Sequence, residues 1–188
     1  PAGARRPAQL GVRIERVTPL ENPSVNGPWI CNKGRDLMRI FERPRAGHAM
    51  QKGGVVDLET AIRSARRLID HAAHPVAFVS NWGSNEELAA FRQALGARFT
   101  TFVKQDWAAQ PGEPIEDDLL IRADKNPNTL AARALFPAAD DGGALDRATD
   151  LVLVWGEGFD FARVPPGAAI IFLNAYIAPE NSDADVFV

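Results

Sequence analysis

The residue types that could do chemistry are concentrated in the stretch Asn26–Arg35, which contains the only cysteine of the chain, Cys31. A thiolate is a soft ligand that suits iron–sulfur clusters, zinc or copper, although one thiolate does not make a site. Lys33 and Arg35 follow at once, and their positive charge favours the thiolate or a nearby anionic cofactor. The alternative is that Cys31 is a small buried hydrophobic residue beside Trp29. The spacing alone leaves both interpretations open.

Two turns form a second candidate site. Each follows an apolar run typical of a buried parallel strand, and ligands of α/β sheets bind at the carboxyl ends of such strands. The first turn is Ser80–Ser84, and the second contains Gly156 and Gly158, whose backbone N–H groups could approach a phosphate. Glu157 and Asp160 place negative charge where a pyrophosphate would lie. We therefore interpret these turns first as structural.

The remaining polar groups predict no further site. His48 lies alone, whereas His71 and His74 fall at the C-terminal end of a predicted helix, where the helix dipole favours a positive imidazole. Two acidic pairs are interpreted as solvated loop charge, namely Asp117-Asp118 and Asp140-Asp141. The polar run Arg122–Asn128 either docks a partner or pairs internally, and the sequence does not decide between the two.

The composition fits one good-sized globular domain with a small appendage. The chain has 188 residues, 46% of them hydrophobic and 24% charged. A net charge of −3 gives no reason to expect nucleic acid as a partner. No run approaches the length of apolar sequence that a membrane-spanning helix needs. A single cysteine excludes an internal disulfide framework.

Alternating helix and strand signals predict an α/β fold with a doubly wound, mostly parallel sheet over residues 46–188. Asp57 is expected to cap a helix that runs to about Ala73, and Ser84 begins a capping box for a helix that ends at Gly96. Thr129 is expected to cap a brief helix through Leu135. Apolar runs predict buried strands at 76–79, 99–103, 151–155 and 169–173, with 119–121 either strand or loop. The first helix should bury one stripe, consisting of Leu58, Ala61, Ile62, Ala65, Leu68, Ile69 and Ala72.

Residues 1–45 differ from the rest of the chain in their secondary-structure pattern. Val12–Val17 alternates approximately between apolar and charged residues and suggests a short strand. The lack of Met at position 1 and the abrupt ending at Val188 are interpreted as signs of a piece of a longer polypeptide.

The cysteine-containing stretch resembles a known family. The motif Val25-Asn26-x-x-Trp29-Ile30-Cys31-x-x-Gly34-Arg35 is similar to the segment that closes the iron–sulfur domain in the large electron-transfer subunit of NADH-quinone oxidoreductase (respiratory complex I). That subunit belongs to the molybdopterin oxidoreductase family, which includes formate dehydrogenases. Three later stretches follow the family's order, namely Val79–Glu87, Ala148–Glu157 and Ser182–Val186.

The resemblance implies that Cys31 is the last ligand of a four-iron cluster (4Fe-4S), whose other ligands come from an upstream C-x-x-C-P-x-G-C run. Pro1-Ala2-Gly3-Ala4 looks like that run without its first cysteines, and Ala4 stands where a thiolate is required. A methyl group cannot ligate iron, so a cluster is expected only if upstream cysteines exist. Residues 1–45 would then be the remnant of the cluster domain.

For residues 46–188 the resemblance implies a molybdopterin-oxidoreductase-like scaffold, truncated at its C-terminal end, in which Gly156 and Gly158 form a vestigial pterin-nucleotide turn. Molybdopterin itself is not expected, because no cysteine or serine lies between Thr101 and Asn181. Asp117 or Asp118 remains a candidate metal ligand, since aspartate serves in some members.

The implied function is an electron-transfer and scaffold portion of a complex I-type oxidoreductase. Its partners would be other subunits of that complex, and it would be peripheral on the cytoplasmic side of the inner membrane. Two alternatives stay open: part of a formate dehydrogenase-like molybdopterin enzyme, or a cofactor-free interaction domain.

Overall fold

The computed structural model describes residues 14, 16–24, 27–30, 32–36, 38, 42–106, 112, 115–118 and 122–188. The chain divides into two compact units, Pro1–Pro44 and Arg45–Val188. In the first unit, α1 (Asn32–Arg35) is a single helical turn, and Asn22 forms an isolated antiparallel bridge with Gly27. Much of the strand predicted over Val12–Val17 lies outside the described residues, and Ile14, Arg16 and Val17 are not in regular structure.

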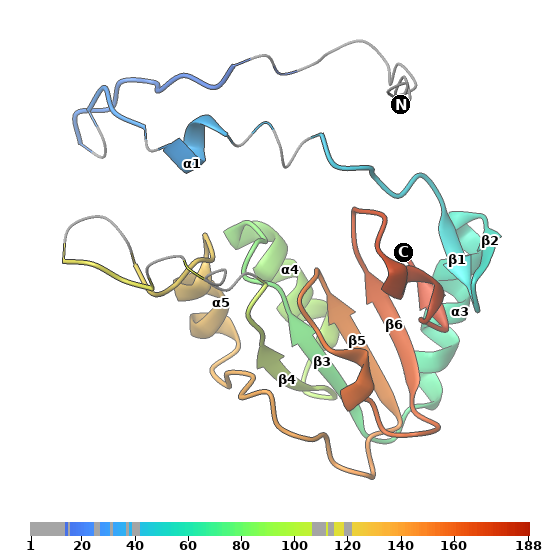
Figure 1. Cartoon of the computed structure of the whole chain (residues 1–188). Coiled ribbons are helices and arrows are strands. Elements are labelled where there is room, and N and C mark those ends of the chain that lie inside the picture. The colour runs from blue at the N-terminus through green and yellow to red at the C-terminus, as the bar shows by residue number, and fades with distance from the viewer. Residues whose placement is uncertain are drawn as a thin grey trace. The chain divides into compact units, whose positions relative to one another are not determined.

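The second unit is an α/β domain built on one mixed sheet of seven strands, ordered β2-β1-β7-β6-β5-β3-β4 (Figure 1). The five strands from β7 to β4 are mutually parallel, whereas β1 is antiparallel to both β7 and β2. The strands are β1 (Ala49–Gln51), β2 (Gly54–Val56), β3 (Pro75–Val79), β4 (Thr100–Val103), β5 (Leu151–Trp155), β6 (Ala169–Leu173) and β7 (Val186–Phe187). The prediction of a mostly parallel α/β sheet is confirmed.

The central strands form because their apolar runs are buried on both faces of the sheet. Every residue of β3 is buried, as are the first four residues of β5. The β1–β2 hairpin turns at Lys52 and Gly53, which both have positive φ values of 48° and 76°. Consecutive positive φ angles give the turn the twist that neighbouring antiparallel strands need. No pattern in the sequence predicts this hairpin.

Two helices begin at the caps that the sequence predicts. Helix α3 (Leu58–His71) starts after Asp57, whose Oδ1 accepts a hydrogen bond of 2.8 Å from the Thr60 backbone N–H. Helix α4 (Asn85–Leu95) has a complete capping box at Ser84 and ends at Gly96. Each cap satisfies N–H groups that lack partners within the helix.

Two details of the predicted helices are wrong. Helix α5 (Thr129–Leu135) has Asn128 as its N-cap, and Thr129 is instead its first residue. On α3, Leu58 and Ile62 of the predicted stripe are exposed, because the helix packs against the sheet through its other apolar residues. Ala61 is fully buried there, and Leu68 and Ile69 are partly buried.

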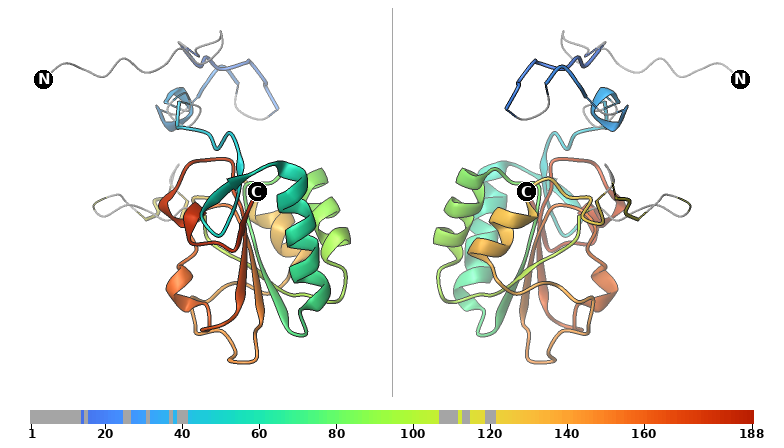
Figure 2. Two further views of the ribbon diagram at one scale, coloured as in Figure 1. Left: turned by 90° about the vertical axis from the view of Figure 1, so that its right-hand side faces the viewer. Right: turned by 90° about the vertical axis from the view of Figure 1, so that its left-hand side faces the viewer.

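The helices α3, α4 and α5 all cover one face of the sheet (Figure 2). The hydrophobic cluster on that face includes Ala61, Leu88 and Phe136, one from or directly after each helix. The opposite cluster, around Phe78 and Phe172, is covered by connections and by the short 3₁₀ helix η1 (Phe161–Arg163). A second 3₁₀ helix, η2 (Pro179–Ser182), precedes β7. The sheet therefore departs from the doubly wound expectation, since α-helices of the described part lie on only one face. No helix in the described ranges is long and apolar enough to cross a bilayer.

Candidate functional site

The sheet has a switch point between β3 and β5. From β3 the chain moves to one neighbour, β4, and later returns to the other side of β3 as β5. Loops that leave a sheet in opposite directions open a crevice at the carboxyl ends of the strands, where α/β proteins bind ligands. The residues that follow β3, β4 and β5 therefore define the candidate site.

Lys104, directly after β4, fills the bottom of this crevice. Its side chain is only 1% exposed, and its ammonium group contacts the Asp106 carboxylate and the backbone carbonyl of Glu157. Burial lowers the pKa of Lys104, and the attraction of Asp106 partly opposes that shift. The lysine thus links the end of β4 to the turn after β5. Because it is buried, a substrate has no access to its amine.

Asp106 completes the network on the side of β3. Its Oδ2 accepts hydrogen bonds from Ser80 Oγ at 3.0 Å and from the Asn81 backbone N–H at 2.6 Å. Ser80 Oγ in turn accepts from the Trp82 backbone N–H at 3.0 Å. The carboxylate therefore has a buried cation and two hydrogen-bond donors from its own chain, as a buried charge requires.

The glycines of the second turn pack against this network. Gly156 and Gly158 have φ values of 77° and 85°, which disfavour any side chain. A Cβ on Gly156 would lie 2.8 Å from Asp106 Oδ1, and one on Gly158 would lie 2.7 Å from the Gln105 carbonyl oxygen. The chain itself thus occupies the space into which these glycines open, where a phosphate-binding turn would admit a ligand.

The first turn is covered by the segment before α5. The Asn81 side chain is fully buried and donates from Nδ2 to Thr129 Oγ1 at 3.2 Å. The backbone carbonyl of Asn81 accepts from the Asn128 N–H at 3.0 Å. Asn81 Oδ1 has no hydrogen-bond partner among the described residues. Asn126 Nδ2 donates to Gln105 Oε1 at 2.7 Å. Residues of the polar run Arg122–Asn128 thus form hydrogen bonds within the chain across the crevice.

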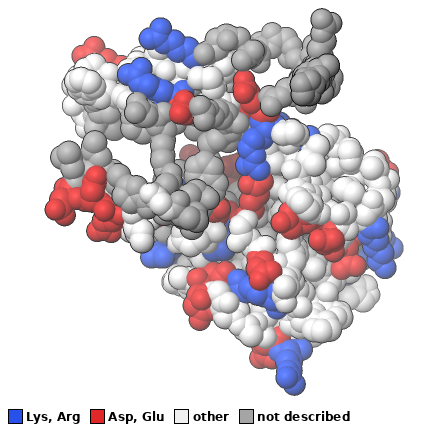
Figure 3. Space-filling model, in the orientation of Figure 1, with Lys and Arg blue, Asp and Glu red and all other residues white. Residues whose placement is uncertain are grey.

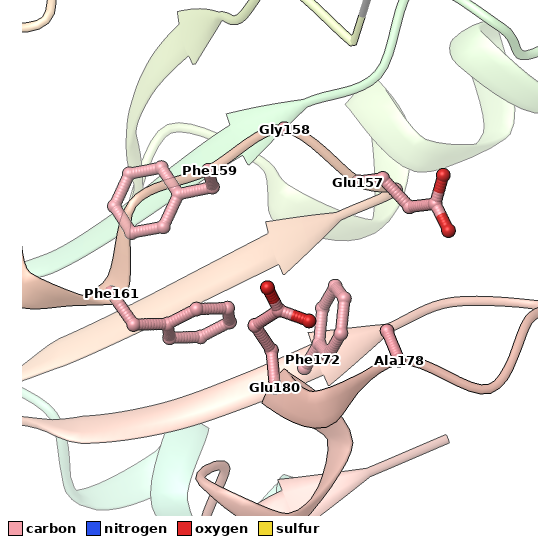
Figure 4. Close-up of a pocket in the computed structure, with 8 residues that line it drawn as sticks. Glu157, Gly158, Phe159, Phe161, Phe172, Ala178 and Glu180 are labelled. Carbon is pink, nitrogen blue, oxygen red and sulfur yellow. The ribbon is translucent and has the colours of Figure 1, made fainter.

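A small cavity of about 170 Å³ lies on the other side of the Gly156–Gly158 turn (Figure 4). Its lining combines turn residues, aromatic rings and two carboxylates: Gly156, Glu157, Gly158, Phe159, Phe161, Phe172, Ala178 and Glu180. Glu180 directs its carboxylate toward the rings of Phe161 and Phe172, whereas Glu157 directs its own away from them. Among the described residues the lining has no basic side chain. This cavity suits a cation and opposes a phosphate.

The other predicted polar sites are dispersed. Cys31 lies outside the described residues, and Asp117 and Asp118 are exposed. His48, His71 and His74 are exposed as well. Across the described ranges, no group of three or more His, Cys, Asp or Glu side chains could hold a metal ion. On the face that Figure 3 displays, acidic and basic side chains of the described residues are interspersed.

One acidic residue was misjudged from the sequence. Asp140 is not a solvated loop charge, because Arg163 binds it through two hydrogen bonds of 2.7 and 2.8 Å, and only 12% of its side chain is exposed. Burial alone would raise the pKa of Asp140, but the hydrogen bonds from Arg163 and from the Gly142 N–H lower it overall. The Arg163 guanidinium also lies 4.9 Å from the ring centre of Phe159.

Sequence reasoning also missed the Lys104–Asp106 pair. The available signal was two opposite charges that directly follow an apolar strand, at the edge where parallel strands end.

Comparisons with protein-family models, with curated proteins and with solved structures found no match.

Proposed function

We propose that the chain is part of the large electron-transfer subunit of a complex I-type NADH-quinone oxidoreductase. Within it, Arg45–Val188 acts as a scaffold for neighbouring subunits and carries no redox cofactor of its own. The family assignment rests on the resemblance of the Cys31 motif and on the order of the later motifs. The scaffold role rests on the geometry of the switch point.

The observation that carries the scaffold role is the filled crevice. Lys104 and Asp106 occupy the place where a ligand of an α/β sheet would bind, and Ser80 and Gly156 pack directly on them. Removing these groups to admit a dinucleotide would break a buried ion pair, which is strongly destabilising. A domain with such a crevice is better suited to hold its shape than to bind and release a ligand.

The residues of the Gly156–Gly158 turn do not fit a pterin nucleotide. A pyrophosphate at this turn would lie beside Glu157, and the adjoining cavity contains the carboxylate of Glu180. Like charges a few ångströms apart repel by about 1 to 4 kcal/mol even when partly screened. This disagreement favours the scaffold over the formate dehydrogenase-like alternative.

The chain does not fit a four-iron cluster either. Such a cluster takes four protein ligands, and the sequence contains the single thiol of Cys31. Under the proposal, electrons therefore pass through cofactors held by other parts of the complex. The contribution of this chain is the surface on which those parts assemble.

A test is to express the tagged chain in the organism from which it comes and to purify it under mild conditions. We expect flavin, iron and NADH-dependent ferricyanide reduction to co-purify with it, and to be absent from a tag-only control. Recovery with molybdenum, pterin and formate-dependent dye reduction would overturn the scaffold proposal in favour of the catalytic alternative. Recovery of the chain alone would contradict its membership of a respiratory complex.

A further inference from the structure

We infer that the cavity beside the Gly156–Gly158 turn binds a small organic cation, namely an ammonium group on a short alkyl chain. The inference is independent of the proposed respiratory role. It rests on three properties of the cavity: its aromatic walls, the carboxylate directed into it, and its size of about 170 Å³ (Figure 4).

The aromatic walls form a connected series of rings. Phe159 and Phe161 meet edge to face with ring centres 5.6 Å apart, and Phe161 meets Phe172 in the same way at 5.3 Å. Phe159 and Phe172 are buried in the core, so the cavity wall is held in place before any ligand arrives. Aromatic rings attract cations to their faces and pack against methylene groups through their carbon atoms. Because the Arg163 guanidinium already lies over Phe159, Phe161 and Phe172 are the rings offered to a ligand.

The carboxylate gives the cavity its charge preference. Glu180 lies on η2, is half-buried, and directs its carboxylate toward the rings of Phe161 and Phe172. Glu157 adds negative charge on the opposite side of the lining, and Lys104 holds the Glu157 carbonyl in place. Phe161 and Glu180 thus combine an apolar surface with an anion. An alkylammonium ion matches this pair, because its chain is apolar and its head is a hydrogen-bond donor.

A metal ion fits this cavity less well than an organic cation. Calcium takes six to eight oxygen ligands, and magnesium requires a near-octahedral set. Here one carboxylate points inward, and three of the other lining residues are phenylalanines. The described residues contain no cluster of three or more metal-ligating side chains. The aromatic wall would leave a metal ion without ligands, whereas it contributes directly to binding an organic cation.

The test is a titration of the whole chain with n-butylammonium, followed by NMR signals of the phenylalanine rings. The neutral analogue 1-butanol and the anion butyrate serve as matched ligands. We expect saturable shifts with a dissociation constant in the millimolar range for n-butylammonium alone. The proposal is wrong if 1-butanol or butyrate binds as tightly, or if no saturable shift occurs up to about 50 mM.

Two variants of lining residues and one control variant locate the site. Glu180→Gln keeps the shape of the side chain and removes its charge, so we expect roughly tenfold weaker binding. Glu86→Gln makes the same charge change at an exposed position on α4 and should leave binding unchanged. Phe161→Leu keeps an apolar wall without the ring face and should also weaken binding of n-butylammonium. Equal affinity of wild type and Glu180→Gln would place the cation elsewhere and overturn the assignment.

Discussion

Gly83, in the turn after β3, lies directly against the indole of Trp155, the last residue of β5. A Cβ on Gly83 would be 2.5 Å from Trp155 Cη2, closer than any real contact. The indole has little room to retreat, because it also packs on Phe91, with ring centres 4.8 Å apart. The missing side chain therefore lets the β3 turn and the end of β5 pack together at the switch point.

Replacing Gly83 by alanine should destabilise the domain, since the added methyl group forces the indole or the turn to shift. We expect the free energy of unfolding to fall by about 1–3 kcal/mol. Urea denaturation followed by tryptophan fluorescence measures this change. Gly47→Ala is the matched control, because nothing lies within 4 Å of a Cβ at that position. Equal midpoints for the two variants would show that the contact does not constrain the turn.

Replacing Lys104 by methionine should be more damaging, because Asp106 would remain buried without its cation. The expected loss is roughly 3–5 kcal/mol in the free energy of unfolding. The double variant Lys104→Met with Asp106→Asn should lose less than Lys104→Met alone, since the amide oxygen still accepts from Ser80 and Asn81. Arg66→Met removes an exposed charge as a control. A double variant that is less stable than the lysine variant would contradict the pairing.

The Asp140–Arg163 pair predicts a pH dependence of stability. The pKa of Asp140 in the folded state lies below the ordinary aspartate value of 3.8. The pair therefore stabilises the protein fully above that ordinary value, and this contribution is lost as pH falls through the lower, folded-state pKa.

At pH 7 we expect Asp140→Asn to be less stable than wild type by roughly 2 kcal/mol. The difference should begin to shrink below about pH 4, where the carboxyl of the unfolded chain becomes protonated, and should disappear below the lower pKa of the folded state. Thermal unfolding across this range measures both effects, with the exposed Asp183→Asn as control. A difference that is constant with pH would mean that the charge of Asp140 is not what stabilises the fold.

The chain should have no measurable affinity for guanine nucleotides or for molybdopterin guanine dinucleotide. Asp106 and Ser80 fill the space beside Gly156. The negative charge of Glu157 would repel a pyrophosphate. Glu157→Gln should change little in calorimetric titrations of either ligand. Micromolar binding that tightens in Glu157→Gln would instead place a dinucleotide site at this turn and favour the catalytic alternative.

The features that the sequence predicts correctly are local ones. The cap at Asp57 and the capping box at Ser84 depend on residues three positions apart. Both can therefore be recognised in the sequence without knowledge of the tertiary structure. The strands at 151–155 and 169–173 are apolar along their whole length and are bounded by turn residues, which makes them equally clear.

The features that the sequence does not reveal depend on distant partners. In the sequence Asp140 resembles a solvated loop charge, because its partner Arg163 is 23 residues away. Lys104 contacts Glu157, more than fifty residues away, and no periodicity marks that contact. Strands of two or three residues, such as β7 and β2, are too short to have a periodic pattern, and only their pairing with neighbouring strands defines them. Cys31 stays a prediction, because it lies outside the described residues.

The position of β7 has a consequence for biosynthesis. The β1–β2 hairpin joins the rest of the sheet through β7, where Met50 pairs with Phe187. The hairpin is synthesised early, whereas β7 lies near the end of the chain. While the ribosome is still translating the intervening residues, the hairpin exposes an unpaired edge. Contacts of such long sequence separation slow folding and leave a nascent chain open to misassociation. The hairpin is therefore expected to join the sheet only after residues 186–187 have been synthesised.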